Sequence, residues 1–255
     1  MATPTRDNAF NPISRQDGYY SLLMAAAKRG SAFRAWPTRA VLMKQIYFTG
    51  VQAVLPVALL AMITGTLVIS EMTSVLGINT AFTTKVLLWI VIRELGPLLA
   101  AIVIIARSST AIIAELALMR INGEISALYA MGVDPTGYLL VPRLIGVTLC
   151  VAILSIYFIA TATLGGMLMS ALFQAVPVYR LADQFLAMAN PWELGYAVLK
   201  STVFGVVIAT VACYHGWNVS QSVNAIPQVV TQGVMRSIFL VFLLDALFAY
   251  ALFRL

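Results

Sequence analysis

Four charged side chains lie inside long apolar stretches of this chain: Arg93, Glu94, Lys200 and Asp245. An ionised group is costly in an apolar medium, so it persists only where it is paired, hydrogen-bonded or required for function. Carboxylates and cations in such surroundings can bind a polar ligand in a cavity, or they can form an internal ionic network. The sequence leaves both interpretations open for Arg93 and Glu94.

These four residues are predicted to share one layer of a membrane. Each lies six to eight residues from one end of its apolar stretch, which in a helix is ~9–12 Å below the same membrane boundary. Lys200 and Asp245 fall on consecutive antiparallel stretches, so we expect them to pair. Arg93 and Glu94 are neighbours that point about 100° apart and need other partners, water or a ligand. Gly96-Pro97 follows and predicts a loosened or kinked helix.

The composition indicates which elements must position these residues. The chain has 255 residues, of which 61% are hydrophobic and 10% charged, against about 45–50% and about 25% in soluble proteins. Lipid can serve as the solvent for so much apolar surface. We therefore expect an all-α integral membrane protein with five transmembrane helices. The predicted spans are approximately 51–70, 86–106, 144–172, 194–214 and 234–252, within one membrane domain at 45–255.

Residues 1–44 form a separate N-terminal segment in this prediction. From residue 18 onward it mixes aromatic and apolar residues with cations, which favours an amphipathic helix lying in the headgroup plane; the alternative is a disordered basic tail. Of the sixteen Lys and Arg residues, eleven fall on the N-terminal side of the predicted membrane and three on the other. This bias places the N-terminus in the cytoplasm and the C-terminus outside. The net charge of +6 then indicates a membrane surface, not nucleic acid.

The segment 107–142 is too polar to span a membrane and too apolar to be disordered. Its residues 111–130 predict a short amphipathic cytoplasmic helix, suited to contact another protein; the alternative is a helix resting on the membrane surface. Gly132 predicts the end of that helix. Asp134-Pro135 predicts the start of the next one, with an N-cap followed by a first-turn proline.

The sequence contains no constellation that indicates catalysis or a metal site. There is no glycine-lysine pair of a phosphate-binding loop, and neither Gly-x-Ser-x-Gly nor His-Glu-x-x-His occurs. His215 is the single histidine, and Cys150 and Cys213 lack the spacing of metal ligands. We therefore expect no catalytic residue and no metal ligand. Active transport by this chain would draw its energy from an ion gradient or from a partner.

The run Arg93-Glu94-Leu95-Gly96-Pro97 resembles the MlaE/YrbE family, the permeases of MCE-type lipid ABC transporters. Lys200, Asn218 and Asp245 lie in further stretches that look like this family. Ala106, Ser109 and Ala117 depart from it, since family members usually carry glycine at these positions. Between the run 93–97 and the C-terminal stretches that begin near Lys200, the resemblance continues in the same order and spacing. It includes Arg107, Ala114-Glu115-Leu116, Leu118-Met119-Arg120, Glu124, Met131-Gly132-Val133-Asp134-Pro135 and Val141-Pro142-Arg143.

The resemblance implies the permease subunit of an ATP-driven transporter in the bacterial inner membrane. Such a subunit would move phospholipid or a related lipid and help maintain outer-membrane lipid asymmetry. Its partners would be a second permease copy in a homodimer, ABC ATPase subunits in the cytoplasm and an MCE-domain protein in the periplasm. ATP and Mg²⁺ would bind the ATPase, so no cofactor is expected on this chain. The lipid and the direction of transport stay open.

The resemblance also implies roles for individual residues. Arg93, Glu94, Leu95 and Pro97 would line a lipid cavity at the dimer interface, open toward the periplasm. A coupling helix would take up ATPase motion through Arg107, Glu115, Met119, Arg120 and Glu124. Two other functions compete with this one: a gradient-driven secondary transporter of a hydrophobic substrate, which favours internal repeats, and a lipid-modifying enzyme, which needs a catalytic constellation.

Overall fold

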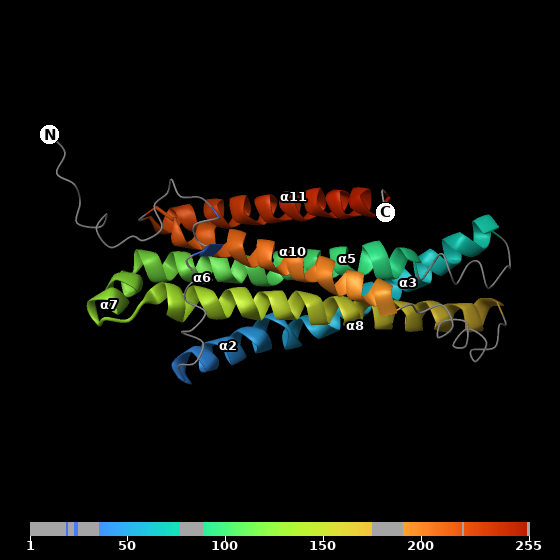
Figure 1. The fold of residues 1–255 in the computed structure, drawn as a ribbon, viewed down its shortest axis with the longest axis horizontal. Coiled ribbons are helices and arrows are strands. Elements are labelled where there is room, and N and C mark those ends of the chain that lie inside the picture. The colour runs from blue at the N-terminus through green and yellow to red at the C-terminus, as the bar shows by residue number, and fades with distance from the viewer. Residues whose placement is uncertain are drawn as a thin grey trace.

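The computed structural model describes residues 19, 23–24, 36–76, 89–174, 191–220 and 222–253. All regular structure in this part of the chain is helical, and the long helices lie side by side in an elongated bundle (Figure 1). Five helical segments within these ranges are long and apolar enough to cross a membrane. This confirms the prediction of a helical protein with five membrane spans.

Each span is one long helical segment, and four of the five spans consist of two or more consecutive elements. A short helix, α7, lies at one end of the bundle between the second and third spans (Figure 1). In chain order the elements are α2 (Trp36–Thr49), η3 (Val51–Ala53), α3 (Val54–Leu76), η4 (Val91–Leu95), α5 (Gly96–Ile104), η5 (Ile105–Ser109), α6 (Thr110–Ile121), α7 (Glu124–Ala130), η6 (Thr136–Leu140), α8 (Val141–Gln174), α10 (Pro191–Trp217), η7 (Val223–Ala225) and α11 (Ile226–Phe253).

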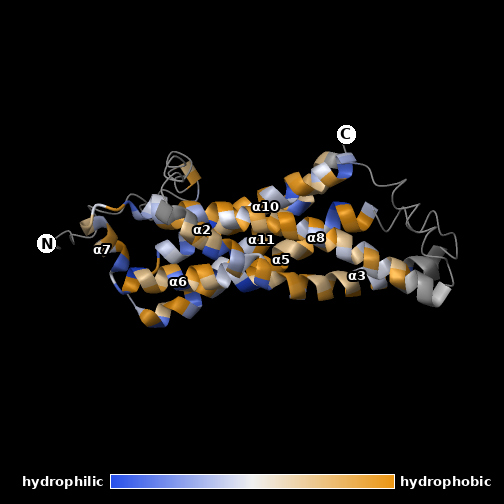
Figure 2. Ribbon diagram, turned by 90° about the horizontal axis from the view of Figure 1, so that it is seen from below, coloured by the Kyte–Doolittle hydropathy of each residue, from blue (hydrophilic) through white to orange (hydrophobic). Residues whose placement is uncertain are grey.

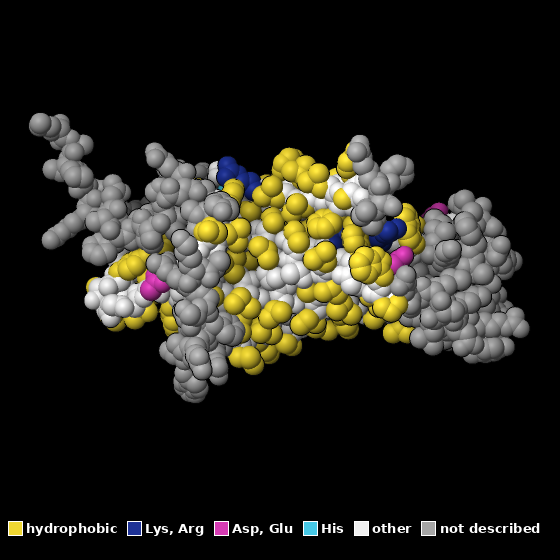
Figure 3. All heavy atoms as spheres, viewed as in Figure 1, with side chains coloured by type: hydrophobic (Ala, Val, Ile, Leu, Met, Phe, Trp, Pro, Cys, Tyr) yellow, Lys and Arg dark blue, Asp and Glu magenta, His cyan; other side chains and the backbone are white. Residues whose placement is uncertain are grey.

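Helix α8 lies at the centre of the bundle and packs against α2, α3, α5 and α10. Small residues let these helices approach closely, as is usual between helices in lipid. A Cβ on Gly65 of α3 would overlap the backbone of Ala162, and one on Gly205 of α10 would overlap that of Thr148. Most large apolar side chains on the outer faces of α3 and α11 are exposed; Figure 2 shows the apolar character of α3, and Figure 3 shows the apolar surface over α11. Such faces suit contact with lipid or another protein chain.

The predicted boundary at residue 44 does not mark a boundary between helices. Helix α2 begins at Trp36 and continues through Gly50 and η3 into α3, so residues 36–44 belong to the helix of the first span, whose membrane-crossing segment runs from Ala40 to Glu71. Leu42 and Ile46 are partly buried at a helical spacing, which extends the helix toward the N-terminus. Most of the predicted interfacial helix at 18–44 lies outside the described residues.

The prediction of one amphipathic helix at 111–130 was wrong. Helix α6 continues the second span to Ile121, where the chain turns at Gly123 with a φ of 76° before α7 begins. The apolar residues Ile112, Ile113 and Leu116 are buried, and α6 packs against α10 and α11. The amphipathic pattern therefore reflects packing of α6 on one side inside the bundle.

The predicted helix end at Gly132 and start at Asp134 are both confirmed. Gly132 has a φ of 76°, and its N–H and that of Val133 donate to the carbonyls of Tyr129 and Leu128 at 3.0 Å, which is a Schellman cap. The Asp134 carboxylate accepts from the N–H groups of Thr136 and Gly137 at 3.3 and 3.2 Å. These two caps fix the path of the chain on either side of the tight connection after α7.

Two further spans also begin earlier than the hydropathy pattern predicted. The third begins at Thr136, not near 144, because Arg143 is buried in an ion pair and does not end the helix. The fifth begins in η7 and α11, not near 234, with exposed polar residues such as Gln228 and Gln232 in its first turns. Polar residues at the ends of spans therefore shortened the predicted helices.

Candidate functional site: a buried ionic cluster between three spans

The side chain of Lys200 on α10 is fully buried, with 0% of its surface exposed. Its Nζ lies 2.6 Å from Oε2 of Glu94 in η4 and 2.7 Å from Oδ1 of Asp245 in α11. The ion pair predicted between Lys200 and Asp245 is thus present, and Glu94 is a second partner that the sequence argument did not assign. One ammonium group therefore ties three spans together.

The local backbone explains why Lys200 fits here. Residues Val91–Leu95 form a π-helical turn immediately before Gly96 and Pro97. Pro97 has no N–H to donate to the carbonyl four residues earlier, that of Arg93. That carbonyl accepts a hydrogen bond from Nζ of Lys200 at 3.2 Å. The helix distortion predicted from Gly96-Pro97 therefore supplies a third acceptor for the buried ammonium group.

Arg93 completes the charge balance of this region. Its guanidinium group lies 5.2 Å from the ring centre of Trp89 and 5.9 Å from that of Tyr196, within the range of cation–π contacts. The Tyr196 hydroxyl donates to the carbonyl of Phe248 at 3.1 Å. Arg93 and Lys200 offset the two carboxylates, so the four charges sum to zero. A neutral, hydrogen-bonded cluster is tolerated in a membrane far better than a net charge.

The cluster is closed on one side and open on the other. Lys200 is fully buried, Asp245 is 17% exposed and Glu94 is 31% exposed. Arg93 and Leu95 are also partly exposed, whereas Pro97 is buried inside the protomer against the bundle. Of the four residues predicted to line a lipid cavity, Arg93, Glu94 and Leu95 thus reach the surface and Pro97 does not. The open side offers both a hydrogen-bond donor and an acceptor to a polar group.

The residues predicted for a coupling helix divide between two places. Glu124 is exposed in the first turn of α7. Met131 and Val133, for which the sequence indicated no role, are exposed apolar side chains just after the last turn of the same helix. The others lie on the second span within the bundle. Met119 packs partly against the core, and Arg120 is partly buried on the same helix.

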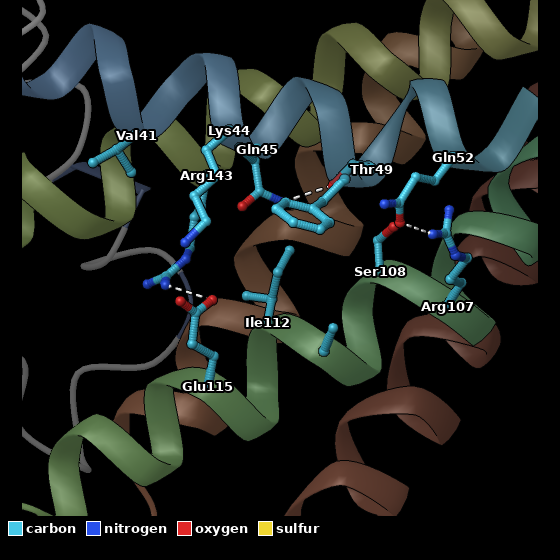
Figure 4. A pocket seen from close by; sticks show the side chains of 12 residues that line it. Val41, Lys44, Gln45, Thr49, Gln52, Arg107, Ser108, Ile112, Glu115 and Arg143 are labelled. Atoms are coloured by element: carbon cyan, nitrogen blue, oxygen red, sulfur yellow. Dashed lines mark hydrogen bonds and ion pairs between the residues drawn. The ribbon is translucent and has the colours of Figure 1, made fainter.

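Arg107 and Glu115 line a second polar region, at the α7 end of the bundle (Figure 4). Glu115 accepts from Nη2 of Arg143 at 2.8 Å, and Arg107 donates to Gln52 of the first span. Arg143 belongs to the Val141-Pro142-Arg143 stretch that resembles the family, and the sequence indicated no role for it. The available signal was its position next to a predicted apolar span, because a cation buried there needs an anionic partner.

A bundle of apolar membrane-spanning helices that enclose a charge-balanced ionic cluster defines a polytopic helical membrane protein with an internal polar site. Comparison with known proteins narrows this class. The sequence profile of the family described as Permease MlaE matches residues 42–251. The chain therefore belongs to the MlaE permease family.

Individual relatives agree with this assignment. The chain is 30% identical over 162 residues to a probable ABC transporter permease protein of Synechocystis, covering 64% of this chain and 62% of that protein. It is 28% identical over 153 residues to the chloroplastic protein TRIGALACTOSYLDIACYLGLYCEROL 1 of Arabidopsis thaliana, covering 60% of this chain and 44% of that protein. The chain thus spans less than two thirds of these two relatives.

A longer match links the chain to a third relative. It is 27% identical over 219 residues to the intermembrane phospholipid transport system permease protein MlaE of Haemophilus influenzae. This match covers 84% of the chain and 83% of that protein.

Proposed function

We propose that this chain is the membrane-spanning permease subunit of an ABC transporter that moves phospholipid or a related lipid. The observation that carries the proposal is the ionic cluster around Lys200, which opens to the protein surface at Arg93 and Glu94. Family membership and the names of the Synechocystis and Haemophilus relatives support it.

In this proposal the open side of the cluster binds the polar part of the lipid. The Arg93 guanidinium can donate to a phosphate group, and the Glu94 carboxylate can accept from an amine or hydroxyl group. The burial of Lys200 and its three acceptors hold Glu94 in place. Leu95 and the apolar faces of neighbouring spans would contact the acyl chains. Two copies of the chain would enclose the cavity as a homodimer.

The energy for transport would come from ATPase subunits that bind ATP and Mg²⁺ at the cytoplasmic end. We place α7 at that end, with the N-terminus in the cytoplasm and the C-terminus in the periplasm of a bacterial inner membrane. Glu124, Met131 and Val133 would then contribute to the surface that docks the ATPase. An MCE-domain protein would meet the opposite end and exchange lipid with the cavity. This route would maintain the lipid asymmetry of the outer membrane.

Reconstitution of the assembled transporter in liposomes tests the proposal, with ATP-dependent transfer of a fluorescent phospholipid to the MCE partner as the readout. Glu94→Gln is expected to lower the transfer rate by roughly tenfold, as loss of one charged contact would do. Glu193→Gln is the matched control, because this partly exposed carboxylate lies in the first turn of α10, about 10 Å along the helix from Lys200. It is expected to keep the wild-type rate.

Two outcomes would contradict the proposal. An unchanged transfer rate in Glu94→Gln would remove the ionic cluster from lipid transport. Transfer that continues without nucleotide and stops when an ionophore dissipates the ion gradient would favour the gradient-driven secondary transporter instead.

A further inference from the structure

A cavity of about 430 Å³ lies between α2, α6 and α8 near the α7 end of the bundle (Figure 4). We propose that this cavity binds the phosphate group of an anionic membrane lipid, at a site separate from the ionic cluster around Lys200. The residues that line it are Val41, Lys44, Gln45, Phe48, Thr49, Gln52, Arg107, Ser108, Ala111, Ile112, Glu115 and Arg143.

The charges of the cavity favour an anion. Lys44, Arg107 and Arg143 contribute three positive charges, and Glu115 contributes one negative charge. Arg143 is the most deeply buried of these, with 4% of its side chain exposed, whereas Glu115 is 56% exposed. Water therefore screens the carboxylate better than it screens the cation beside it. The interior of the cavity keeps an excess of positive charge.

Several buried donors also point to a ligand with many acceptor atoms. Arg143 donates through Nη2 to Glu115, and Arg107 donates through Nη2 to Gln52. Nη1 of each arginine and Oγ of Ser108 are buried, without a hydrogen-bond partner among the residues that the structure describes. An unsatisfied buried donor is costly. A phosphate group accepts several hydrogen bonds at once, and arginine matches its geometry well.

The depth of the cavity fits a lipid headgroup. Gly205 of α10 lies against Thr148 of α8, and these helices are antiparallel neighbours. Arg143 lies five residues before Thr148, and Lys200 lies five residues before Gly205. Because the two helices run in opposite directions, Arg143 and Lys200 lie on opposite sides of this contact along the bundle. At 1.5 Å per residue the two charged levels lie roughly 15 Å apart. With Lys200 ~9–12 Å inside one boundary of a hydrocarbon core ~30 Å thick, Arg143 lies near the other boundary.

The first span provides an apolar surface that continues from the cavity. Phe48 lines the cavity, and Leu55 and Met62 follow it at seven-residue intervals, so all three lie on one side of the helix. All three are exposed, and Leu55 is 70% exposed. A lipid with its phosphate at Arg107 and Arg143 would lay an acyl chain along this face. A free phosphate ion would not use it, which favours a lipid as the source of the phosphate.

Native mass spectrometry of the purified full-length chain can measure binding of phosphatidylglycerol, with diacylglycerol and inorganic phosphate as comparison ligands. The double variant Lys44→Gln/Arg107→Gln is expected to weaken phosphatidylglycerol binding by roughly tenfold or more, while the buried Arg143–Glu115 pair stays intact. Arg236→Gln is the matched control, because this exposed cation on α11 contacts Tyr19 and His215 outside the cavity. It is expected to bind as the wild type does.

A second variant separates lipid from free phosphate. Leu55→Ser removes apolar contact at an exposed position and is expected to weaken phosphatidylglycerol binding several-fold without affecting thermal unfolding. Equal binding of phosphatidylglycerol and diacylglycerol, or no effect of the double variant, would overturn the proposal. Binding of inorganic phosphate with the same dependence on Lys44 and Arg107, without binding of the lipid, would overturn the assignment to a lipid. These measurements use neither ATP nor a partner, so their failure leaves the proposed transport function untouched.

Discussion

Nζ of Lys200 lies 2.6 Å from the Glu94 carboxylate, although 106 residues separate them in the sequence. The same Nζ also contacts Asp245 at 2.7 Å and the backbone carbonyl of Arg93 at 3.2 Å. The cluster thus joins η4, α10 and α11 at one level of the bundle. The effects of substitutions in the cluster are not expected to be independent, because replacing one residue leaves the charges of the others partly uncompensated.

Replacing Lys200 is expected to destabilise the protein strongly. Lys200→Ala leaves two carboxylates without their buried cation, at a cost of about 3–5 kcal/mol. Asp245→Asn in the same chain is expected to restore part of this loss, and adding Glu94→Gln should restore more. Equilibrium unfolding in detergent measures each variant. Effects that simply add up would show that the three residues do not act as one cluster.

Two substitutions at Glu94 are expected to differ in their effect on stability. Glu94→Arg would place a second cation beside Lys200 and would therefore disturb folding as well as ligand contacts. Glu94→Gln keeps the shape and one acceptor oxygen, and is expected to reduce unfolding free energy by only about 1–2 kcal/mol. Comparing both variants by thermal unfolding checks this ranking. Equal stability of the two would contradict the close contact between Glu94 and Lys200.

Alanine is expected to have opposite effects on stability at two glycines, Gly123 before α7 and Gly195 in α10. Gly123 has a φ of 76°, and a Cβ added there would have no atom within 4 Å. Gly123→Ala therefore causes no steric overlap, but it strains the backbone and is expected to cost about 1–2 kcal/mol. Gly195 in α10 also has open space but no positive φ, so Gly195→Ala is expected to stabilise by about 0.5–1 kcal/mol. Thermal unfolding of both variants gives the sign directly. The same sign at both positions would count against the left-handed turn before α7.

Replacing Glu115 is expected to cost more stability than replacing Arg143, its partner in the ion pair. Glu115→Gln leaves a buried cation with a weaker partner and is expected to cost about 1–3 kcal/mol. Arg143→Met leaves only an exposed carboxylate and is expected to change stability by less than about 1 kcal/mol. Unfolding should be measured in a maltoside detergent, which has no phosphate group to replace Glu115. A larger loss in Arg143→Met would contradict this burial pattern.

The sequence by itself determined the features that depend on short stretches of chain and on the thickness of a membrane. Apolar length predicted five spanning helices, Gly132 and Asp134-Pro135 predicted the caps after α7, and equal depth predicted the pair of Lys200 with Asp245. Hydrogen-bond caps involve residues a few positions apart, and hydrophobic length is a property of each segment alone.

Only the tertiary structure decided how the spans are rotated and which of them are neighbours. It placed Glu94 beside Lys200, brought Arg143 to Glu115, and kept residues 107–121 inside the bundle where the sequence suggested a separate helix. These outcomes depend on close contacts such as Gly205 against Thr148, which fix helix rotation through packing at single residues. Hydropathy does not encode those contacts, because apolar residues on a membrane helix can face either lipid or protein.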